Sequence, residues 1–154
     1  MRYTIRRGRS GSDGRSEASS LQCRHGALQS WRRGHNPATV LGDVSCPGRA
    51  GGAKPVYVDT RQTAYKLSAH LVEEAITAAT KVIIINSPNN PTGVVYNHAS
   101  LLRFAELALK RKIRIVFDEC YSELVRNGAR HLNVVQLLGS VKEQTILVNS
   151  FSKS

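Results

Sequence analysis

The sequence predicts an α/β fold, a mostly parallel sheet with flanking helices. From Lys54 onward, short apolar runs alternate with amphipathic stretches, which is typical of strand–helix–strand units around a parallel sheet. One of these runs, residues 82–85, is continuously apolar, as expected of a strand that is buried on both faces. With 154 residues, of which 41% are hydrophobic, the chain is long and apolar enough for one domain with a core.

Each expected element follows from a local pattern. The expected strands are residues 55–58, 82–85, 113–117 and 145–148, and the expected helices start at Ser68, at Asn97 or Ser100, and near Val134. Ser68 can cap the first helix, whose apolar positions extend along one face to Ala79. The basic run 110–112 favours the C-terminal dipole of the second helix.

Polar residues follow three of the expected strands. They are residues 86–93, Asp118 with Glu119, and Asn149 with Ser150. The carboxyl ends of parallel strands meet at one edge of a sheet, where α/β proteins place their ligands. We therefore expect a binding site at this edge.

Residues 1–53 differ from the rest of the chain. They are rich in Arg, Gly, Ser, Ala and His and show no sustained period of 2 or 3.6. Residues 1–54 hold ten Lys or Arg against three acids, a net of +7, whereas residues 55–154 hold twelve against eight, a net of +4. We interpret 1–53 as a frame-shifted or disordered basic segment and 54–154 as a partial ligand-binding domain.

Composition argues against several other classes. A small nucleic-acid-binding protein is the competing hypothesis for such a basic chain, but Trp31 is the only aromatic residue between Ile5 and Pro55. No run of 18 apolar residues and no secretory signal occur, so we expect a cytoplasmic protein without a membrane partner. The three cysteines lack metal-ligand spacing, so we expect no metal site and no disulfide framework.

Three short strings, in order, each follow an apolar strand. They are Asn90-Pro91-Thr92-Gly93, Asp118-Glu119-Cys120-Tyr121 and Ser150-Phe151-Ser152-Lys153. Together they resemble the large domain of class I/II aminotransferases, which are pyridoxal 5′-phosphate (PLP) enzymes of fold type I. The resemblance covers residues 54–154, which is about two thirds of this chain. It implies a partial large domain of a fold-type-I enzyme, of the aspartate or aromatic aminotransferase branch.

The resemblance assigns the catalytic role to Lys153. A lysine amine forms a Schiff base with PLP, is displaced by the substrate amine, and then moves a proton as general base and acid. Asp118 matches the carboxylate that keeps the pyridine nitrogen protonated, so that the ring can act as an electron sink.

Four further residues match cofactor contacts of the family. Asn90 and Tyr121 match the donors to the ring oxygen, Ser150 matches the hydroxyl that donates to the phosphate, and Ser152 is a second phosphate contact. Glu119, Glu123, Arg126 and the histidines have no such match, and we interpret them as surface or packing residues.

The chain departs from the family before Pro55. Intact relatives carry there a glycine-rich loop that cradles the phosphate and an aromatic residue that stacks on the ring. Codons allowed for residues 15–47 can be chosen so that a frame shifted by one nucleotide resembles this region. A single insertion or deletion near Gly51 or Gly52 would then explain the basic segment.

The family also places two arginines beyond Lys153, one for the phosphate and one for the substrate carboxylate. We expect the intact form to be a homodimer that transaminates an amino acid with a 2-oxo acid, and the 154-residue chain alone to be inactive. A β-lyase or related synthase uses the same cofactor residues and is the alternative within the enzyme class.

Overall fold

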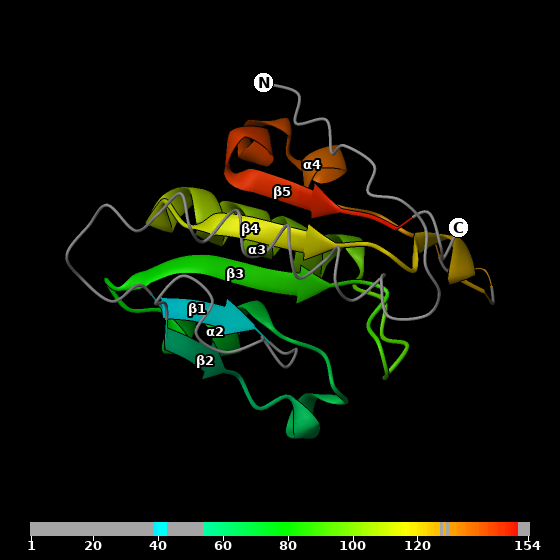
Figure 1. The fold of residues 1–154 in the computed structure, drawn as a ribbon, viewed down its shortest axis with the longest axis horizontal. Helices are drawn as coiled ribbons and strands as arrows, with labels where there is room; N and C mark the ends of the chain where they lie inside the picture. Colours follow the sequence, from blue (N-terminus) through cyan, green and yellow to red (C-terminus); the bar gives the residue numbers. More distant parts are fainter. Residues whose placement is uncertain (1–38, 43–53, 127, 129, 151–154) are drawn as a thin grey trace, which may run out of the picture.

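A five-stranded parallel sheet forms the centre of the molecule (Figure 1). The computed structural model describes residues 39–42, 54–126, 128 and 130–150. The strands are β1 (Thr39–Gly42), β2 (Lys54–Tyr57), β3 (Thr80–Asn86), β4 (Arg114–Asp118) and β5 (Thr145–Val148). They lie in the order β2-β1-β3-β4-β5, and every neighbouring pair is parallel. The predicted parallel sheet is confirmed.

Helices α2 and α3 lie behind the sheet in Figure 1, and α4 lies above β5 in the same view. They are α2 (Ala69–Ala75), α3 (His98–Arg111) and α4 (Val134–Leu137), and the short 3-10 turns are η2 (Arg61–Thr63), η3 (Ser122–Leu124) and η4 (Gly139–Gln144). Phe104 and Leu101 of α3 are fully buried with Ile83 and Ile85 of β3 in the larger core cluster. The helices therefore cover the face of the sheet to which Ile83 and Ile85 point.

The other face of the sheet carries a second apolar cluster. Val82 and Ile84 of β3, Val116 of β4 and Val148 of β5 form it, and each is at most 5% exposed. Since side chains alternate along a strand, Val82 and Ile84 point away from the helices while Ile83 and Ile85 point toward them. This explains why residues 82–85 are continuously apolar.

The helix starts agree with the sequence, but one helix end does not. Ser68 caps α2 by accepting from the backbone of Leu71, and Asn97, one of the two predicted starts, caps α3. The prediction that the first helix continues to Ala79 is wrong, since α2 ends at Ala75. The Thr77 N–H donates to Thr80 Oγ1 at 2.9 Å, and the Thr80 N–H donates to the Thr77 carbonyl at 3.0 Å. Such local bonds compete with helix formation.

The structure contains one strand that the sequence analysis did not predict. β1 (Thr39–Gly42) lies between β2 and β3, inside the segment 1–53 that we expected to lack regular structure. Only Val40 and Leu41 of its four residues are strongly apolar, so this run is too short for a periodic pattern to reveal the strand. The boundary between 53 and 54 stays a prediction.

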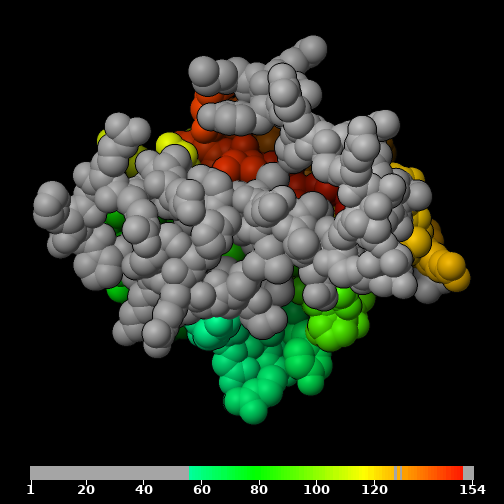
Figure 2. Space-filling model, in the orientation of Figure 1, coloured from blue at the N-terminus to red at the C-terminus, as the bar shows by residue number. Residues whose placement is uncertain are grey.

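The loops after β2 and β3 protrude at the lower edge of the molecule (Figure 2). Asn90 and the three residues that follow it are exposed there.

Among the described residues, no helix combines the length and the apolar character needed to cross a bilayer.

Candidate functional site

The carboxyl ends of β3, β4 and β5 lie side by side, as the polar strand ends predicted. Asn86 of β3 is in register with Asp118 of β4, and Asp118 is in register with Val148 of β5. This register places the loops that carry Asn90, Tyr121 and Ser150 at one edge of the sheet. Ser152 and Lys153 lie outside the described residues.

The structure joins Asn90 and Tyr121, which are 31 positions apart in the sequence. The side-chain amide of Asn90 donates to the Tyr121 hydroxyl oxygen at 3.0 Å. An amide and a phenol are both groups that can donate hydrogen bonds, so this contact brings two donor-type side chains into one small region. Both side chains belong to loops beyond the strand ends, as a binding role requires.

The turn that presents Asn90 is held by its own backbone. The N–H of Asn89 donates to Val94 O, and the N–H of Gly93 donates to Asn89 O, each at 2.8 Å. Gly93 has φ of +70°, a left-handed conformation that glycine adopts without a steric penalty. The Thr92 hydroxyl donates to Asn89 Oδ1 at 2.8 Å. The string Asn90-Pro91-Thr92-Gly93 is therefore an ordered turn.

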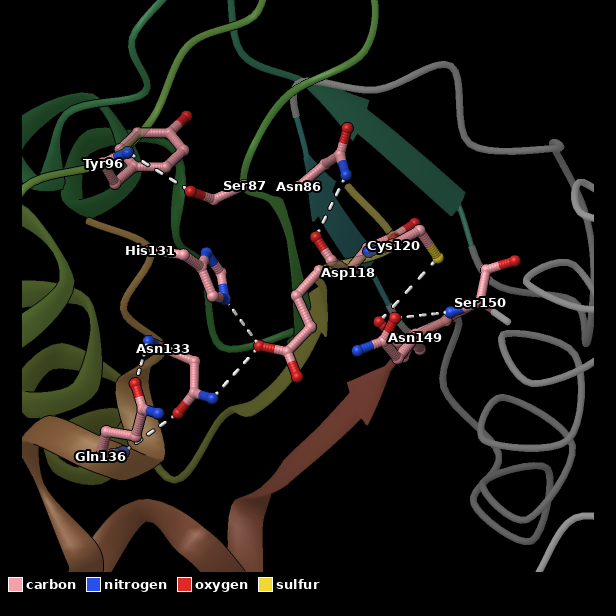
Figure 3. Close-up of polar contacts among 12 residues, drawn as sticks. Asn86, Ser87, Tyr96, Asp118, Cys120, His131, Asn133, Gln136, Asn149 and Ser150 are labelled. Atoms are coloured by element: carbon pink, nitrogen blue, oxygen red, sulfur yellow. Dashed lines mark hydrogen bonds and ion pairs between the residues drawn. The ribbon is translucent and has the colours of Figure 1, made fainter. Parts of the chain in front are cut away.

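Asp118 is the buried acid of the site, with 5% of its surface exposed. Its Oδ1 accepts from the N–H of Cys120 at 3.2 Å, which orients the carboxylate at the end of β4. Its backbone carbonyl accepts from the N–H of Ser87 at 2.9 Å and from the Asn86 side chain at 3.1 Å (Figure 3). The residue is thus fixed by bonds from two segments.

Ser150 follows β5 and is half-buried. Its N–H donates to Asn149 Oδ1 at 2.7 Å, and both residues are seen at the end of β5 in Figure 3. The hydroxyl of Ser150 thereby joins the same sheet edge as Asp118.

Glu119 takes part in a partly buried polar cluster that the sequence analysis did not anticipate. We interpreted Glu119 and the histidines as surface or packing residues. Glu119 Oε2 lies 2.8 Å from His131 Nε2 and accepts from Asn133 Nδ2 at 3.1 Å. The Glu119 and His131 side chains are only 13% and 15% exposed, so both are packing residues that also bond each other. Asn133 in turn caps α4 in a reciprocal pair with Gln136 (Figure 3).

Sequence reasoning also missed Asn86, which we counted only as a turn former. The structure buries it to 4% exposure between the β3 and β4 loops. The available signal was its place as the first polar residue after a buried strand.

The described groups make a consistent donor and acceptor set. A buried carboxylate, an amide, a phenol and a hydroxyl lie at one edge of a parallel sheet. Asn90 comes from the loop after β3, Tyr121 from the loop that follows Asp118, and Ser150 from the segment after β5. Such a set suits a polar, planar ligand that has a basic nitrogen and several oxygens. It does not by itself select a reaction.

Comparison with known proteins identifies the family. The model for aminotransferase class I and II matches residues 48–154. The aspartate aminotransferase of Bacillus sp. (strain YM-2) is 46% identical over 107 residues, which are 69% of this chain and 27% of that protein. The aspartate aminotransferase of Bacillus subtilis (strain 168) is 43% identical over the same share of each chain.

Solved structures agree with this assignment. The aromatic aminotransferase from Pyrococcus horikoshii OT3 superposes with a TM-score of 0.77 and 28% identity, covering 87% of this chain and 37% of that one. The predicted fold, part of the large domain of a fold-type-I enzyme, is confirmed. The chain spans about a quarter of the length of the curated relatives it matches, 27% for the first two. It belongs to the class I and II aminotransferase family.

Proposed function

We propose that this chain is part of a PLP-dependent aminotransferase that transfers an amino group from an amino acid to a 2-oxo acid. One observation carries the proposal: the Asn90 amide and the Tyr121 phenol meet at 3.0 Å, at the sheet edge that holds the buried Asp118. A carboxylate and two adjacent donors are what the pyridine nitrogen and the ring oxygen of PLP require.

Each residue has a distinct task in this proposal. Asp118 holds a proton on the pyridine nitrogen, since a buried carboxylate stabilises a neighbouring positive charge. Asn90 and Tyr121 donate to the ring oxygen, and Ser150 donates to the phosphate, with Ser152 as a second contact. PLP, when bound, supplies an electron sink for the bond cleaved at the substrate Cα. Lys153 anchors the cofactor covalently and carries the proton between substrate positions.

The names of the relatives suggest the substrates. Two are aspartate aminotransferases and one solved structure is an aromatic aminotransferase, so we propose an acidic or aromatic amino acid as the donor. A β-lyase or synthase remains the alternative that shares these cofactor residues. The cytoplasmic location and the homodimer stay predictions for the intact protein.

Covalent trapping tests the proposal. A frame-restored, full-length version is incubated with PLP and reduced with borohydride, and peptide mass mapping locates the modified lysine. Label on Lys153 that is lost in Lys153→Ala is expected, and equal labelling of other lysines would refute the assignment. Incubated with amino acids and 2-oxoglutarate, the 154-residue chain should form no glutamate above the Lys153→Ala control, whereas a frame-restored, full-length version should.

A further inference from the structure

We infer that Asn86 is a positioning residue that holds Asn90 and Tyr121 together at the cofactor-binding edge. Its role in positioning the two side chains rests on the structure, and its effect on cofactor binding rests on the function proposed above. Asn86 closes β3, lies opposite Asp118 in the sheet, and is 4% exposed. It would touch neither cofactor nor substrate in this role.

The side chain of Asn86 bonds both site loops at once. Its Nδ2 donates to the backbone carbonyl of Asp118 at 3.1 Å, and its Oδ1 accepts from the backbone N–H of Asn90 at 2.9 Å. Figure 3 shows the first of these bonds crossing from β3 to β4. The orientation of the amide is determined by its partners, because rotating it by half a turn would face donor to donor and acceptor to acceptor.

These bonds complete a ring that passes through both loops. Asn86 holds the Asn90 backbone, the Asn90 side chain donates to Tyr121 at 3.0 Å, and the chain returns from Tyr121 to Asp118 through three peptide bonds. The backbone carbonyl of Asp118 accepts from the Asn86 side chain, so the four residues form a closed ring of bonds. Displacing any member therefore moves the others.

The Asn86 side chain is buried, whereas the bond between Asn90 and Tyr121 is exposed to water. Asn90 lies in an exposed turn, so water can replace its contact with Tyr121, whereas water has little access to Asn86. A buried amide that loses a partner is left unsatisfied, which strongly favours the paired arrangement. The Asn86 bonds consequently fix the place of the Asn90 backbone before any ligand arrives.

Amide hydrogen exchange on the 154-residue chain tests the positioning directly. Asn86→Leu has a similar volume but no polar atoms, and should lower protection of the Asn90 N–H about tenfold, the effect of one net hydrogen bond. Asn86→Asp keeps the acceptor for Asn90 and should keep that protection, but it loses the donor to Asp118 and should shift the Tyr121 ring signals in NMR spectra.

The matched control is Thr80→Val at the opposite end of the same strand. Thr80 is 3% exposed, and its hydroxyl accepts from the N–H of Thr77 at 2.9 Å. The control should lose comparable stability and leave the Asn90 protection and the Tyr121 signals unchanged. Unchanged protection in Asn86→Leu, or an equal loss in Thr80→Val, would overturn the inference.

A measurement on the unaltered chain covers the case in which the variants do not fold. A scalar coupling across the hydrogen bond from the Asn90 amide nitrogen to the Asn86 side-chain carbonyl carbon is expected. Its absence in well-resolved spectra would overturn the inference without any substitution.

A double-mutant cycle on PLP binding separates this inference from the proposed function. Asn86→Leu and Tyr121→Phe should each raise the PLP dissociation constant about tenfold. The double variant should also raise it only about tenfold, because both substitutions break the same ring of hydrogen bonds. Additive losses would show that Asn86 acts elsewhere. If a frame-restored, full-length version binds PLP no better than its Tyr121→Phe and Lys153→Ala variants, the proposed function fails, while the exchange experiment on the 154-residue chain still decides on Asn86.

Discussion

Replacing Asp118 by asparagine isolates the negative charge of the proposed site. Asp118 is 5% exposed, and its Oδ1 accepts from the N–H of Cys120 at 3.2 Å. Asparagine has nearly the same shape and can keep this bond through its amide oxygen. The two Asp118 carbonyl bonds come from its backbone and are also kept. We therefore expect the fold around β4 to survive and only the charge to be lost.

The size of the effect follows from the bond that the proposal assigns to this carboxylate. A hydrogen bond to a charged group contributes about 1.5–3 kcal/mol, and 1.4 kcal/mol is a factor of ten in affinity, so the dissociation constant for PLP should rise about 10–150-fold. Turnover should fall as well, because the pyridine nitrogen then loses the partner that keeps it protonated.

Spectroscopic titration of a frame-restored, full-length version with PLP measures this constant. Asp59→Asn is the matched control, because the same change is made on a carboxylate that is 58% exposed and far along the chain from the strand ends. Urea denaturation of both variants checks that the fold is kept. Equal PLP dissociation constants for Asp118→Asn and Asp59→Asn would refute the role given to Asp118.

Three further predictions concern the fold. Asn97→Ala removes the cap of α3 and should lower the free energy of unfolding by about 1 kcal/mol in urea titrations, and no loss relative to the exposed-site control Ser140→Ala would contradict the cap. Phe104→Ala leaves a cavity under β3 and loses a ring contact with Tyr96, so about 3–5 kcal/mol should be lost; a fall below about 1 kcal/mol would mean that this core collapses around the gap. The Arg61 side chain hydrogen-bonds Asp59 and lowers the pKa of Asp59 to about 2, so NMR titration of Arg61→Gln should return it toward 3.8. Since the folded pKa is the lower one, this contribution to stability is present above about 3.8 and is lost as the pH falls toward 2; an unchanged pKa in Arg61→Gln would contradict the pairing.

The sequence predicted the sheet well where burial leaves a strong pattern. Residues 82–85 form a strand as expected, because a continuous apolar run bounded by polar residues has few other structures available. Residues 145–148 also form the expected strand, although Val148 is its one buried residue. Caps at Ser68 and Asn97 were also predictable, since the side chain and the N–H that it bonds are neighbours in sequence.

Features that depend on contacts between distant residues were less accessible. The motif strings indicated Asn90 and Tyr121 separately, but only the fold shows that they bond each other. Asn86 was overlooked because its place directly after a buried strand fits an asparagine that merely starts a turn as well as one that links two loops. The pairing of Glu119 with His131 spans 12 positions and a change of direction after β4, so no spacing rule applies to it.

The central place of β1 has a consequence for how the segment before Lys54 can change. β2 has no neighbour in the described sheet except β1, and β1 contacts both β2 and β3 through a parallel ladder of main-chain bonds. Main-chain N–H and C=O groups are the same in almost every residue. Pairing through these groups therefore depends on the backbone conformation more than on which side chains the strand carries. A central strand of this kind tolerates changes of residue identity, provided that the replacement keeps the main-chain donors and therefore contains no proline. If the segment upstream of Lys54 is read in a shifted frame, as hypothesised above, the strand order would be kept. The side chains that the unshifted frame specifies for that segment would be lost.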